Sequence, residues 1–598
     1  MMTVDYSSNK AANPPIALPP TRLDITVVIP TYNGADRIPQ VLDRLLQQIS
    51  GRAWEVIVCD NNSTDDTAEV VLSYQQRWPR ASLLRYCFVA EQGAAFARQR
   101  GVAEADGQIV AFLDDDNVPA VDWLENVWQF AIAHPQAGAF GSQIHGDFHG
   151  DLPAEFEQIA CYLAIVERGS VPHLYSPKSK ILPPAAGLAV RRVAWLDAVP
   201  KRLFLNHKGK SAGLASEDLE AMLYIQKAGW EIWYNADMVI THQIPSERLQ
   251  QEYLVSLLRC IGLSRFYIRW LGIKDWQRPF KVPAYIANDL RKLAIHYLKN
   301  GLRQTDLTTV AACERSLLTS IVVSPGFLLR KLSQDLWQTW QDNSLLPNRQ
   351  KWLQRLTDAF ESQQLELYQQ AVVCMGAELT TDKLAAAKFE ILLRLRQDSA
   401  EQPPVTPAQF FPTAERYGLM RTLDRRVVQQ VCGKLGATVS SSIYSLNLSA
   451  ATVGDPGFSH FLEKQLYEHR VNPACLYFEI SEAVLLNLEH DAYRLMGQLK
   501  RLGVGVIVDE ITRMVEVSDY GPGLSVDCLK LSKQLVDRLS KGQDMIFLDW
   551  VKLVQRRGIQ VVAKGVDTPA VLEQLRTLGI ECIQGYQLSK PVPFDPTV

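Results

Sequence analysis

The sequence predicts an α/β protein with two βα regions separated by a helical segment. Short apolar runs alternate with helical patterns from Asp24 to about residue 250. The pattern becomes helical over residues 251–360, and the alternation returns over residues 361–598. Strands that alternate with helices favour a mostly parallel sheet. A chain of 598 residues also exceeds what one hydrophobic core usually serves, so several domains are expected.

The composition is that of an ordinary globular protein. Hydrophobic residues make up 47% and charged residues 21% of the chain, and the net charge of −3 argues against a nucleic-acid-binding protein. The ten cysteines include no CxxC pair, so we expect no zinc site, no disulfide framework and a reducing cytoplasm. Residues 1–23 are predicted to be a flexible leader rather than a targeting peptide. The longest apolar stretch, Leu317–Leu329, is broken by Pro325, so no membrane-spanning helix is expected.

In residues 24–250, three apolar runs each end in polar residues. Ile25–Ile29 is followed by Pro30, Thr31 and Tyr32, Trp54–Cys59 by Asp60 and Asn61, and Ile109–Leu113 by Asp114, Asp115 and Asp116. Ligands of open α/β sheets bind at the carboxyl ends of the strands, so these side chains predict one binding edge. Three consecutive carboxylates are costly unless they are neutralised, and a divalent cation with oxygen ligands would do so. A solvated turn is the plainer alternative.

These segments resemble glycosyltransferase family 2. The motifs are VVIPTYNGAD, VIVCDNNSTDD, EQGAAFARQRGVAEADGQIVAFLDDDN and SEDLE, in the family's order. The resemblance implies a GT-A (Rossmann-like) fold, a nucleotide-sugar donor, a glycan or lipid-linked acceptor, and Mg²⁺ or Mn²⁺ as cofactor. It places Pro30, Tyr32, Asp60, Asn61, Arg98, Asp114 and Asp115 at the donor, and Asp114, Asp116 and His242 at the metal. Because many members carry a carboxylate at the Asn61 position, the base stays open between uridine and guanosine.

The same resemblance implies the catalytic residues. Asp218 corresponds to the general base, with Glu217 beside it, and Gly187 lies in a segment that lines the acceptor side. The acceptor hydroxyl must lose a proton as it attacks the anomeric carbon, and attack opposite the leaving group inverts that centre. The plainer alternative is that both acids simply favour the N-terminus of a helix.

The segment over residues 251–360 is predicted to be a basic and aromatic helical connector. From Ser256 to Arg303 it has ten Lys or Arg residues against two acids, Asp275 and Asp289, with Phe, Tyr and Trp interleaved. This composition favours peripheral contact with a membrane. A helical linker packed on the catalytic domain is the plainer alternative, and binding of nucleic acid is a weaker third.

In residues 361–598, six short apolar runs are each followed by a helical pattern, which predicts a barrel. The motifs FEILLRL, YSLNLSA, FEISEA, CLKLS, VVAKGVDT and IQGYQLSKP resemble the EAL domain of cyclic di-GMP signalling, a modified TIM barrel. The resemblance implies a cyclic di-GMP pocket, and Glu390, Asn447, Glu479 and Asp509 correspond to its first metal site. The pocket as a whole comprises Glu390, Arg394, Asn447, Glu479, Asp509, Glu510, Lys530, Lys564 and Gln584.

Three departures from the EAL pattern predict a receptor without phosphodiesterase activity. Glu510 replaces a second-metal aspartate, Ser532 replaces a ligand, and Lys564 stands at the position of the catalytic glutamate. The Lys564 ammonium would repel a second cation and could instead pair with Asp509 or Glu510. The expectation is a transferase for bacterial exopolysaccharide controlled by cyclic di-GMP. A bifunctional transferase and phosphodiesterase, and a transferase with an inert scaffold, are the alternatives.

Overall fold

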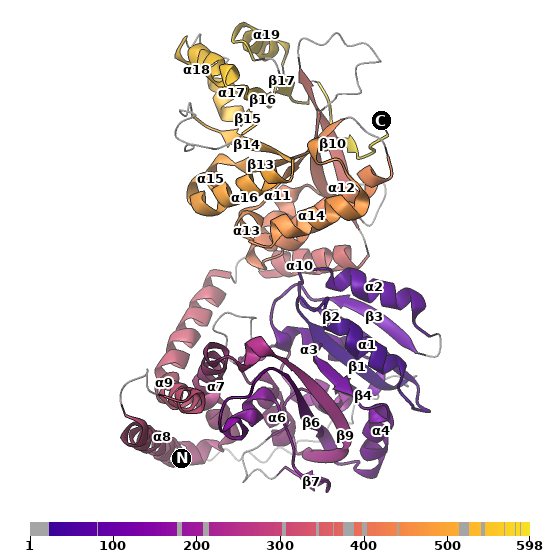
Figure 1. The fold of residues 1–598 in the computed structure, drawn as a ribbon, viewed down its shortest axis with the longest axis vertical. Helices are drawn as coiled ribbons and strands as arrows, with labels where there is room; N and C mark the ends of the chain where they lie inside the picture. The colour runs from indigo at the N-terminus through magenta and orange to yellow at the C-terminus, as the bar shows by residue number, and fades with distance from the viewer. Residues whose placement is uncertain are drawn as a thin grey trace, which may run out of the picture. The chain divides into compact units, whose positions relative to one another are not determined.

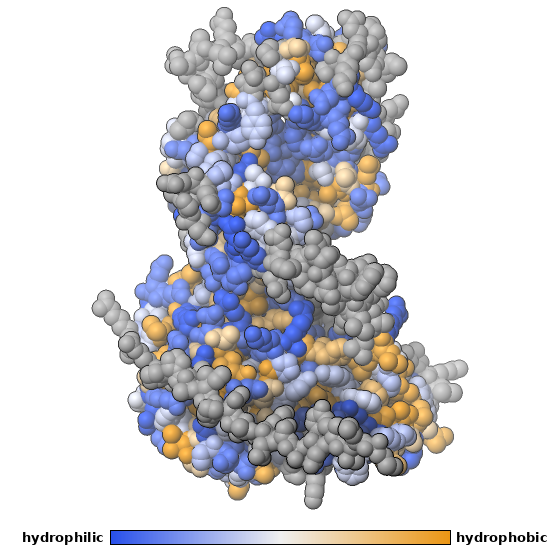
Figure 2. All heavy atoms as spheres, turned by 180° about the vertical axis from the view of Figure 1, so that it is seen from behind, coloured by the Kyte–Doolittle hydropathy of each residue, from blue (hydrophilic) through white to orange (hydrophobic). Residues whose placement is uncertain are grey.

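The computed structural model describes residues 23–79, 82–175, 182–206, 215–301, 307–342, 346–362, 364–374, 388–397, 403–438, 442–513, 526–539, 545–566, 568–580, 582–586 and 588–597. The predicted leader lies outside the described residues except for Leu23. The chain forms two compact units whose main division falls between Trp337 and Gln338 (Figure 1). Each unit has its own nine-stranded sheet. Figure 2 shows hydrophilic and hydrophobic residues mixed over the opposite face.

Parallel strands form one half of the first sheet, whose order is β3-β2-β1-β4-β8-β6-β9-β5 with β7 beside β9. The central strand β1 (Leu23–Thr31) pairs in parallel with β2 (Trp54–Asp60) and β4 (Gly107–Phe112). Its apolar residues are fully buried, as a strand covered on both faces requires. Because the three strands run in one direction, their polar C-terminal residues meet at one edge.

The other half of the first sheet is mixed, so the prediction of a mostly parallel sheet is wrong there. β8 (Ala189–Arg191) is antiparallel to both β4 and β6 (Ala137–His149), and β9 (Glu231–Pro245) is parallel to β6. The strands β5 (Asn117–Pro119) and β7 (His173–Leu174) are antiparallel to β9. Strands of two or three residues carry too little apolar periodicity to be read from sequence.

Helices cover this sheet. α3 (Ala94–Glu104) packs across β1 and β2, and α4 (Trp123–Ala133) packs on β9. The remaining elements before residue 250 are α1 (Ile38–Leu46), α2 (Thr67–Arg77), β3 (Leu83–Phe88), η1 (Phe156–Gln158), η2 (Ala160–Leu163), α5 (Arg192–Ala198), α6 (Glu217–Lys227) and η3 (Ser246–Leu249). α6 starts directly at the predicted catalytic acids.

The segment after residue 250 is helical. It contains α7 (Gln251–Gly272), η4 (Asp275–Gln277), α8 (Arg278–Asn300), α9 (Thr309–Asp342) and α10 (Leu346–Glu361). The helices α7, α8 and α9 lie together at the side of the first unit (Figure 1). The described helices up to Trp337 therefore belong to the same compact unit as the first sheet.

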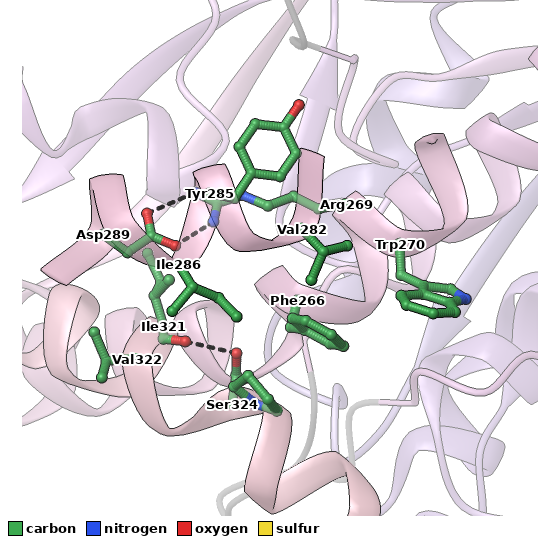
Figure 3. Close-up of a pocket in the computed structure, with 11 residues that line it drawn as sticks. Phe266, Arg269, Trp270, Val282, Tyr285, Ile286, Asp289, Ile321, Val322 and Ser324 are labelled. Carbon is green, nitrogen blue, oxygen red and sulfur yellow. Dashed lines mark hydrogen bonds and ion pairs between the residues drawn. The ribbon is translucent and has the colours of Figure 1, made fainter. Parts of the chain in front are cut away.

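Pro325 does not interrupt α9, contrary to the expectation from sequence. A proline inside a helix leaves the carbonyl four residues earlier without its backbone donor. Here the Ser324 hydroxyl donates to that carbonyl, on Ile321, at 2.7 Å (Figure 3). A serine beside the proline thus satisfies the freed acceptor and lets the helix continue.

The uninterrupted α9 changes the count of possible membrane helices. Within the described residues, one helical segment, Thr309–Lys331, is long and apolar enough to cross a membrane by length and composition alone. The prediction that no segment would reach this length was wrong, because it treated Pro325 as a helix end. Of the most apolar part of this segment, 28% is buried in the structure.

The second sheet is a closed barrel. Seven strands run in parallel around it: β11 (Lys388–Leu395), β12 (Ile443–Asn447), β13 (Leu476–Ser481), β14 (Gly505–Ile511), β15 (Cys528–Leu531), β16 (Gln560–Lys564) and β17 (Cys582–Gln584). β10 (Leu365–Cys374) is antiparallel to both β11 and β17 and closes the ring. β18 (Val592–Pro593) adds to β10. The result is a TIM-barrel-like domain with one reversed strand.

Helices follow the barrel strands as the sequence predicted. They are α11 (Pro407–Arg416), α12 (Met420–Gly436), α13 (Ala450–Val453), α14 (Phe458–His469), η6 (Pro473–Cys475), α15 (Glu482–Asn487), α16 (Glu489–Arg501), α17 (Lys533–Leu539), α18 (Met545–Arg556) and α19 (Pro569–Thr577). Because the strands run in parallel, the residues at their carboxyl ends gather at one mouth of the barrel.

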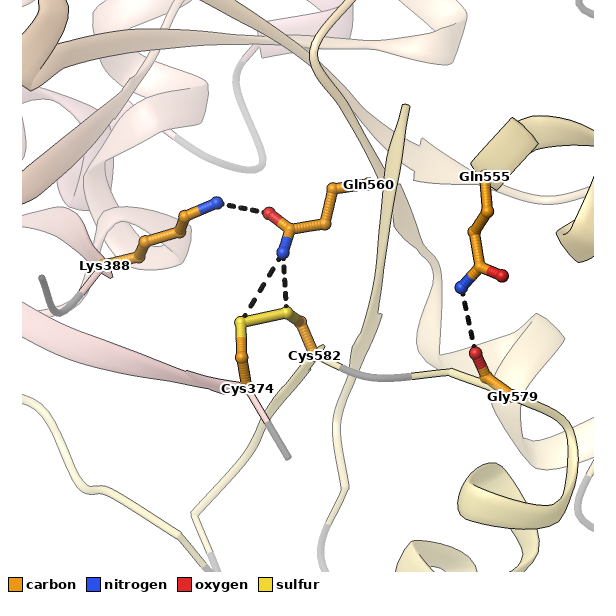
Figure 4. The surroundings of a disulfide bond; sticks show 6 residues. All are labelled: Cys374, Lys388, Gln555, Gln560, Gly579 and Cys582. Atoms are coloured by element: carbon orange, nitrogen blue, oxygen red, sulfur yellow. Dashed lines mark hydrogen bonds between the residues drawn. A yellow bond between two sulfur atoms is a disulfide. The ribbon is translucent and has the colours of Figure 1, made fainter. Parts of the chain in front are cut away.

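A disulfide joins Cys374 and Cys582, so the prediction that the cysteines form none is wrong (Figure 4). The two residues are 208 positions apart in sequence but are direct partners in the β10–β17 pair. Cysteine spacing cannot reveal such a pair, because strand pairing brings the residues together. The Gln560 amide contacts both sulfurs and also accepts a hydrogen bond from Lys388.

We expect Cys374→Ser to lower the free energy of unfolding of the barrel by about 2–4 kcal/mol, because the bond restricts the unfolded chain. Denaturant titration without reductant measures this loss. Reductant should bring the wild-type protein to the same value, and Cys161→Ser, an exposed free cysteine in the first unit, should change neither result. Wild-type stability that does not respond to reductant would show that the bond is not formed.

Candidate functional site

The predicted donor residues lie together at the carboxyl edge of β1, β2 and β4. Tyr32 is 37% exposed directly after β1, as a residue that stacks on a base would be. Asp60 ends β2 and accepts a hydrogen bond from the Tyr86 hydroxyl at 2.7 Å. The side-chain oxygen of Asn61, Oδ1, accepts a hydrogen bond from the Gly93 backbone N–H at 2.6 Å, which fixes the start of α3. Pro30 pairs with Cys59 inside the sheet, one position before this edge.

Arg98 of α3 joins two parts of the predicted site. Its guanidinium donates to Asp114 at 2.9 Å and to Glu217 at 2.9 Å. The side chain is buried, and the pKa of Arg98 is raised because Asp114 and Glu217 outweigh the cost of burial. Its Nε is a buried donor without a partner among the described residues. A permanent cation thus connects the strand edge to the predicted catalytic acids.

Each of the three consecutive aspartates has its own arginine. Asp114 pairs with Arg98, Asp115 with Arg37 at 2.8 Å, and Asp116 with Arg248 at 2.8 Å. Asp115 also accepts from the Thr31 hydroxyl at 2.6 Å. Arginines therefore pair with all three carboxylates in this structure. In particular, both oxygens of Asp115 are held inside the protein.

Asp116 and His242 come together, as the metal prediction requires. His242 Nδ1 lies 3.0 Å from the Leu163 carbonyl oxygen, which can only accept, so Nδ1 carries the proton. Nε2 lies 3.6 Å from Asp116 Oδ2. Burial would raise the pKa of Asp116, but a protonated His242 and Arg248 lower it to about 2. A carboxylate beside an imidazole nitrogen is a donor set that fits a divalent cation when the imidazole is neutral.

The Arg248 guanidinium lies close to both Asp116 and His242, the two residues predicted to hold the metal. The guanidinium is 2.8 Å from Asp116 Oδ2 and 3.4 Å from His242 Nε2. Asp114, the third predicted ligand, is bonded to Arg98 instead. Over the described part of the chain, no three His, Cys, Asp or Glu side chains are grouped closely enough to hold a metal ion. Asp116 and His242 are the two residues that would hold one.

Two backbone N–H groups fix the orientation of the Asp218 carboxylate. Its Oδ2 accepts from the Ala185 backbone N–H at 3.1 Å and its Oδ1 from that of Leu219 at 2.8 Å. Burial and the neighbouring Glu217 raise the pKa of Asp218 to about 6. The preceding Ser216 has a φ of 84°, so the chain turns sharply into α6 at this point. A half-buried carboxylate with this pKa can accept a proton near neutral pH.

The small residue predicted on the acceptor side also has a structural reason. Gly187 has a φ of 65°, and its carbonyl accepts from the Ser142 hydroxyl at 2.6 Å. A Cβ at this position would lie 2.6 Å from that hydroxyl oxygen. The loop that carries Ala185 therefore depends on glycine to pass close to β6.

A second cluster of buried charges lies in the barrel. Glu390 accepts from Lys530 at 2.8 Å and from the amides of Asn447 and Gln584 at 2.8 and 2.9 Å. Lys530 also pairs with Glu479. Burial would raise the pKa of Glu390, but Lys530 and Lys564 lower it to about 2. Burial and Glu390 raise the pKa of Glu479 to about 7.

Lys564 forms the ion pairs that the sequence suggested. Its ammonium lies 2.8 Å from Asp509 and 3.0 Å from Glu510. Burial would lower the pKa of Lys564, but Asp509 and Glu390 raise it. Glu510 has a φ of 57° and is itself exposed. Ser532 accepts from the Leu535 backbone N–H at the start of α17, so it caps a helix. Arg394 is half-buried and donates to the Leu393 carbonyl at 2.8 Å.

Two oxygens in this cluster are suited to a cation. Glu479 Oε2 and Asp509 Oδ1 are buried and have no partner among the described residues. Glu390, by contrast, has both oxygens bonded within the protein. Lys530 and Lys564 together balance Glu390 and Asp509, so the pocket is nearly neutral when Glu479 is protonated. These donors fit one cation better than two.

Arg37 and Arg248 are the site residues that sequence reasoning missed. Both follow a predicted polar segment closely, Arg37 four residues after Asn33 and Arg248 six residues after His242. A basic residue a few positions after a predicted site segment is the signal that could have identified them. Their pairing with Asp115 and Asp116 depends on loop geometry that no local pattern reports.

Two family models match the chain. Residues 26–180 match the model described as glycosyl transferase family 2, and residues 353–591 match the EAL domain. The cyclic di-GMP phosphodiesterase PdeB of Shewanella oneidensis is 28% identical over 254 residues, which are 41% of this chain and 29% of PdeB. The uncharacterized protein Rv1357c of Mycobacterium tuberculosis is 30% identical over 212 residues, which are 34% of this chain and 69% of that protein.

Solved structures match the same C-terminal region. The FimX EAL domain of Pseudomonas aeruginosa bound to c-di-GMP is 24% identical, with a TM-score of 0.36, and the match covers 40% of this chain and 96% of that one. The described barrel has the order of strands and the buried acidic mouth that the EAL resemblance implies. The chain is therefore a fusion of a family 2 glycosyltransferase domain with an EAL domain.

Proposed function

We propose that the first unit is an inverting glycosyltransferase that transfers a sugar from a nucleotide-sugar donor, and that Asp218 is its general base. The observation that carries this proposal is the Asp218 carboxylate, which is half-buried, held by two backbone N–H groups and has a pKa of about 6. Such a group is mostly ionised at neutral pH yet basic enough to take a hydroxyl proton.

The surrounding residues have separate tasks in this mechanism. Tyr32, Asp60 and Asn61 bind the nucleotide, and Arg98 lies where it can bind the diphosphate. Asp116 and His242 would hold Mg²⁺ or Mn²⁺, which stabilises the negative charge of a leaving diphosphate when it is bound. Asp218 takes the proton from the acceptor hydroxyl, and Glu217 stays paired with Arg98, which keeps the two carboxylates from sharing one proton.

We propose that the EAL domain binds cyclic di-GMP without hydrolysing it. Activation of water by two metals needs a second cation and a base, but Lys564 places an ammonium between Asp509 and Glu510. Arg394 makes one hydrogen bond within the described residues, so its remaining N–H groups can pair with a phosphate. The ion pairs of Lys564 would then replace metal ions in a receptor pocket.

Phosphodiesterase activity is the second candidate for this domain. The retained Glu390, Asn447, Glu479 and Asp509, and the unpartnered oxygens of the last two acids, favour it. The similar protein PdeB is named a cyclic di-GMP phosphodiesterase. An inert scaffold is a third candidate. The charges that surround Lys564 make the receptor the best supported of the three.

The setting proposed for this reaction is bacterial polysaccharide synthesis at the inner face of the plasma membrane, with a glycan or lipid-linked acceptor. The similar proteins named above come from bacteria. A cytoplasmic location is part of the proposal, although the Cys374–Cys582 bond argues against a reducing compartment.

We expect Asp218→Asn to lower kcat by about 10²–10⁴-fold and to leave donor binding unchanged, because only proton removal is lost. In the wild-type protein, kcat/KM should fall as pH falls through about 6, where the base becomes protonated. Donor turnover across pH measures both effects. Asp197→Asn, an exposed acid on neighbouring α5, is the matched control. Turnover of Asp218→Asn at the wild-type rate would contradict the assignment.

Cyclic di-GMP should raise the melting temperature of the full chain by mass action, and no linear dinucleotide should form with Mg²⁺ or Mn²⁺. Arg394→Ala should abolish the shift, whereas Arg396→Ala should keep it, because Arg396 is exposed and pairs with Glu366. Lys564→Glu combined with Ser532→Asp should introduce slow hydrolysis. Linear product from the wild-type protein would instead identify a phosphodiesterase, and the absence of any shift would identify a scaffold.

A further inference from the structure

Helix α8 exposes several of its large apolar residues, whereas the residues that it buries are polar. Within Arg278–Asn300, the buried residues are Asp289 and His296. Phe280 is 76% exposed and Leu298 is 85% exposed. A helix on the surface of a water-soluble domain normally shows the opposite arrangement, so this face lacks its usual partner.

The exposed apolar residues of α8 share one stripe. Phe280 and Leu298 lie about five helical turns apart and therefore point in the same direction. Ala287, Leu290 and Ala294 fall between them on the same side of the helix, and all are exposed. The stripe therefore runs along nearly the whole helix.

Basic residues flank this stripe. Lys281, Lys292 and Lys299 lie about one quarter to one third of a turn from the stripe, and all three are exposed. The helix contains five Lys or Arg residues and one acid, Asp289, which is buried. The three lysines lie along one side of the stripe, and the exposed Arg291 falls on the stripe itself. Positive charge beside apolar residues is complementary to the headgroups and acyl chains of an anionic lipid surface.

The inner face of α8 is anchored, so the stripe cannot turn inward. Asp289 forms a two-pronged ion pair with Arg269 of α7, and Arg269 also lies over the Tyr285 ring at 5.1 Å. Phe266, Val282, Ile286 and Ile321 line a small pocket between α7, α8 and α9 (Figure 3). Rotation of α8 would bury its lysines and expose the buried pair.

Several of the ten basic residues between Ser256 and Arg303 are engaged within the protein and are not available to contact a membrane. Arg269 is engaged with Asp289, and Arg278 pairs with Asp275 at 2.9 Å and lies over the Trp270 ring. Arg265 is half-buried, and burial lowers its pKa. The exposed bases of α8 are Lys281, Arg291, Lys292 and Lys299.

The apolar helix α9 does not compete with α8 as the membrane contact. Val310, Cys313 and Leu328 of α9 are buried in clusters of the first unit. α9 also crosses α7 closely at Gly262, where an added Cβ would lie 2.7 Å from Ser320. A helix that packs one face on the domain would have to leave it in order to span a bilayer.

We propose that the stripe of α8, with its lysine border, is a docking surface for an anionic lipid bilayer, on which the first unit lies as a peripheral protein. Trp276, 71% exposed in η4, extends the surface as an interfacial anchor. The proposal deepens the proposed function, since it supplies the surface on which a lipid-linked acceptor would be reached. Its physical basis is independent of the transfer reaction.

Vesicle sedimentation of the full chain tests this surface. The wild-type protein should bind phosphatidylcholine vesicles that contain phosphatidylglycerol, should bind pure phosphatidylcholine weakly, and should be released by salt. Phe280→Glu combined with Leu298→Glu should lower the partition coefficient at least about tenfold. Each of Lys281→Gln, Lys292→Gln and Lys299→Gln should lower it by up to about fivefold at low salt.

Two controls separate docking from folding and from catalysis. Ile49→Glu replaces an apolar residue of the first unit that is 70% exposed elsewhere, and it should bind like the wild-type protein. Asp218→Asn should also bind vesicles normally, because docking needs no turnover. The melting temperatures of the α8 variants and of Ile49→Glu should match that of the wild-type protein, since these substituted side chains are exposed.

Four outcomes would overturn the proposal. One is equal vesicle binding by the wild-type protein and the double Glu variant, and another is no preference for the anionic lipid. Release by detergent but not by salt would indicate that α9 spans the bilayer. Binding to cell membranes but not to protein-free vesicles would identify a protein partner. If the vesicles bind as expected while no sugar is transferred to any acceptor, the proposed function fails and the docking surface stands.

Discussion

Buried carboxylates need positive charge close by, and much of the structure follows from that requirement. Parallel strands bring their acidic C-terminal residues to one edge in the first unit and to one mouth in the barrel. Each cluster would be unstable in a medium of low dielectric without compensation. The first unit supplies arginines, which stay charged at any physiological pH. The barrel supplies Lys530 and Lys564, which are compact point charges.

The type of cation bears on what each site can do. Arg98 and Arg248 hold Asp114 and Asp116 while leaving forked donors beside them, which suits a ligand that brings phosphate oxygens. In the barrel, Lys564 neutralises Asp509 directly and thereby lowers the local demand for a metal ion. The same electrostatic requirement is thus met by forked guanidinium groups in one site and by compact ammonium groups in the other.

Much of this arrangement was predictable, because strand ends and spacing are local features. The runs around Ile25, Trp54 and Ile109 form strands, and Asp60, Asp114 and Asp218 reach the expected edge. The residues that pair with Asp116 and with Cys374 were not predictable. The Asp116–Arg248 ion pair and the Cys374–Cys582 bond depend on where distant loops and strands meet. Pro325 was misread because one serine hydroxyl, on Ser324, replaces its missing hydrogen bond. The outward apolar face of α8 needed the packing of Asp289 before it could be recognised.

The bond between Cys374 and Cys582 also has a mechanical consequence. It closes a covalent ring that contains almost the whole barrel, with 208 positions between its two ends. Stretched out, that much chain would reach roughly 700 Å. Tension applied between the two ends of the protein would therefore bypass the barrel, since the load passes through the sulfur atoms. A protease that cuts once inside the ring would leave the two pieces covalently attached.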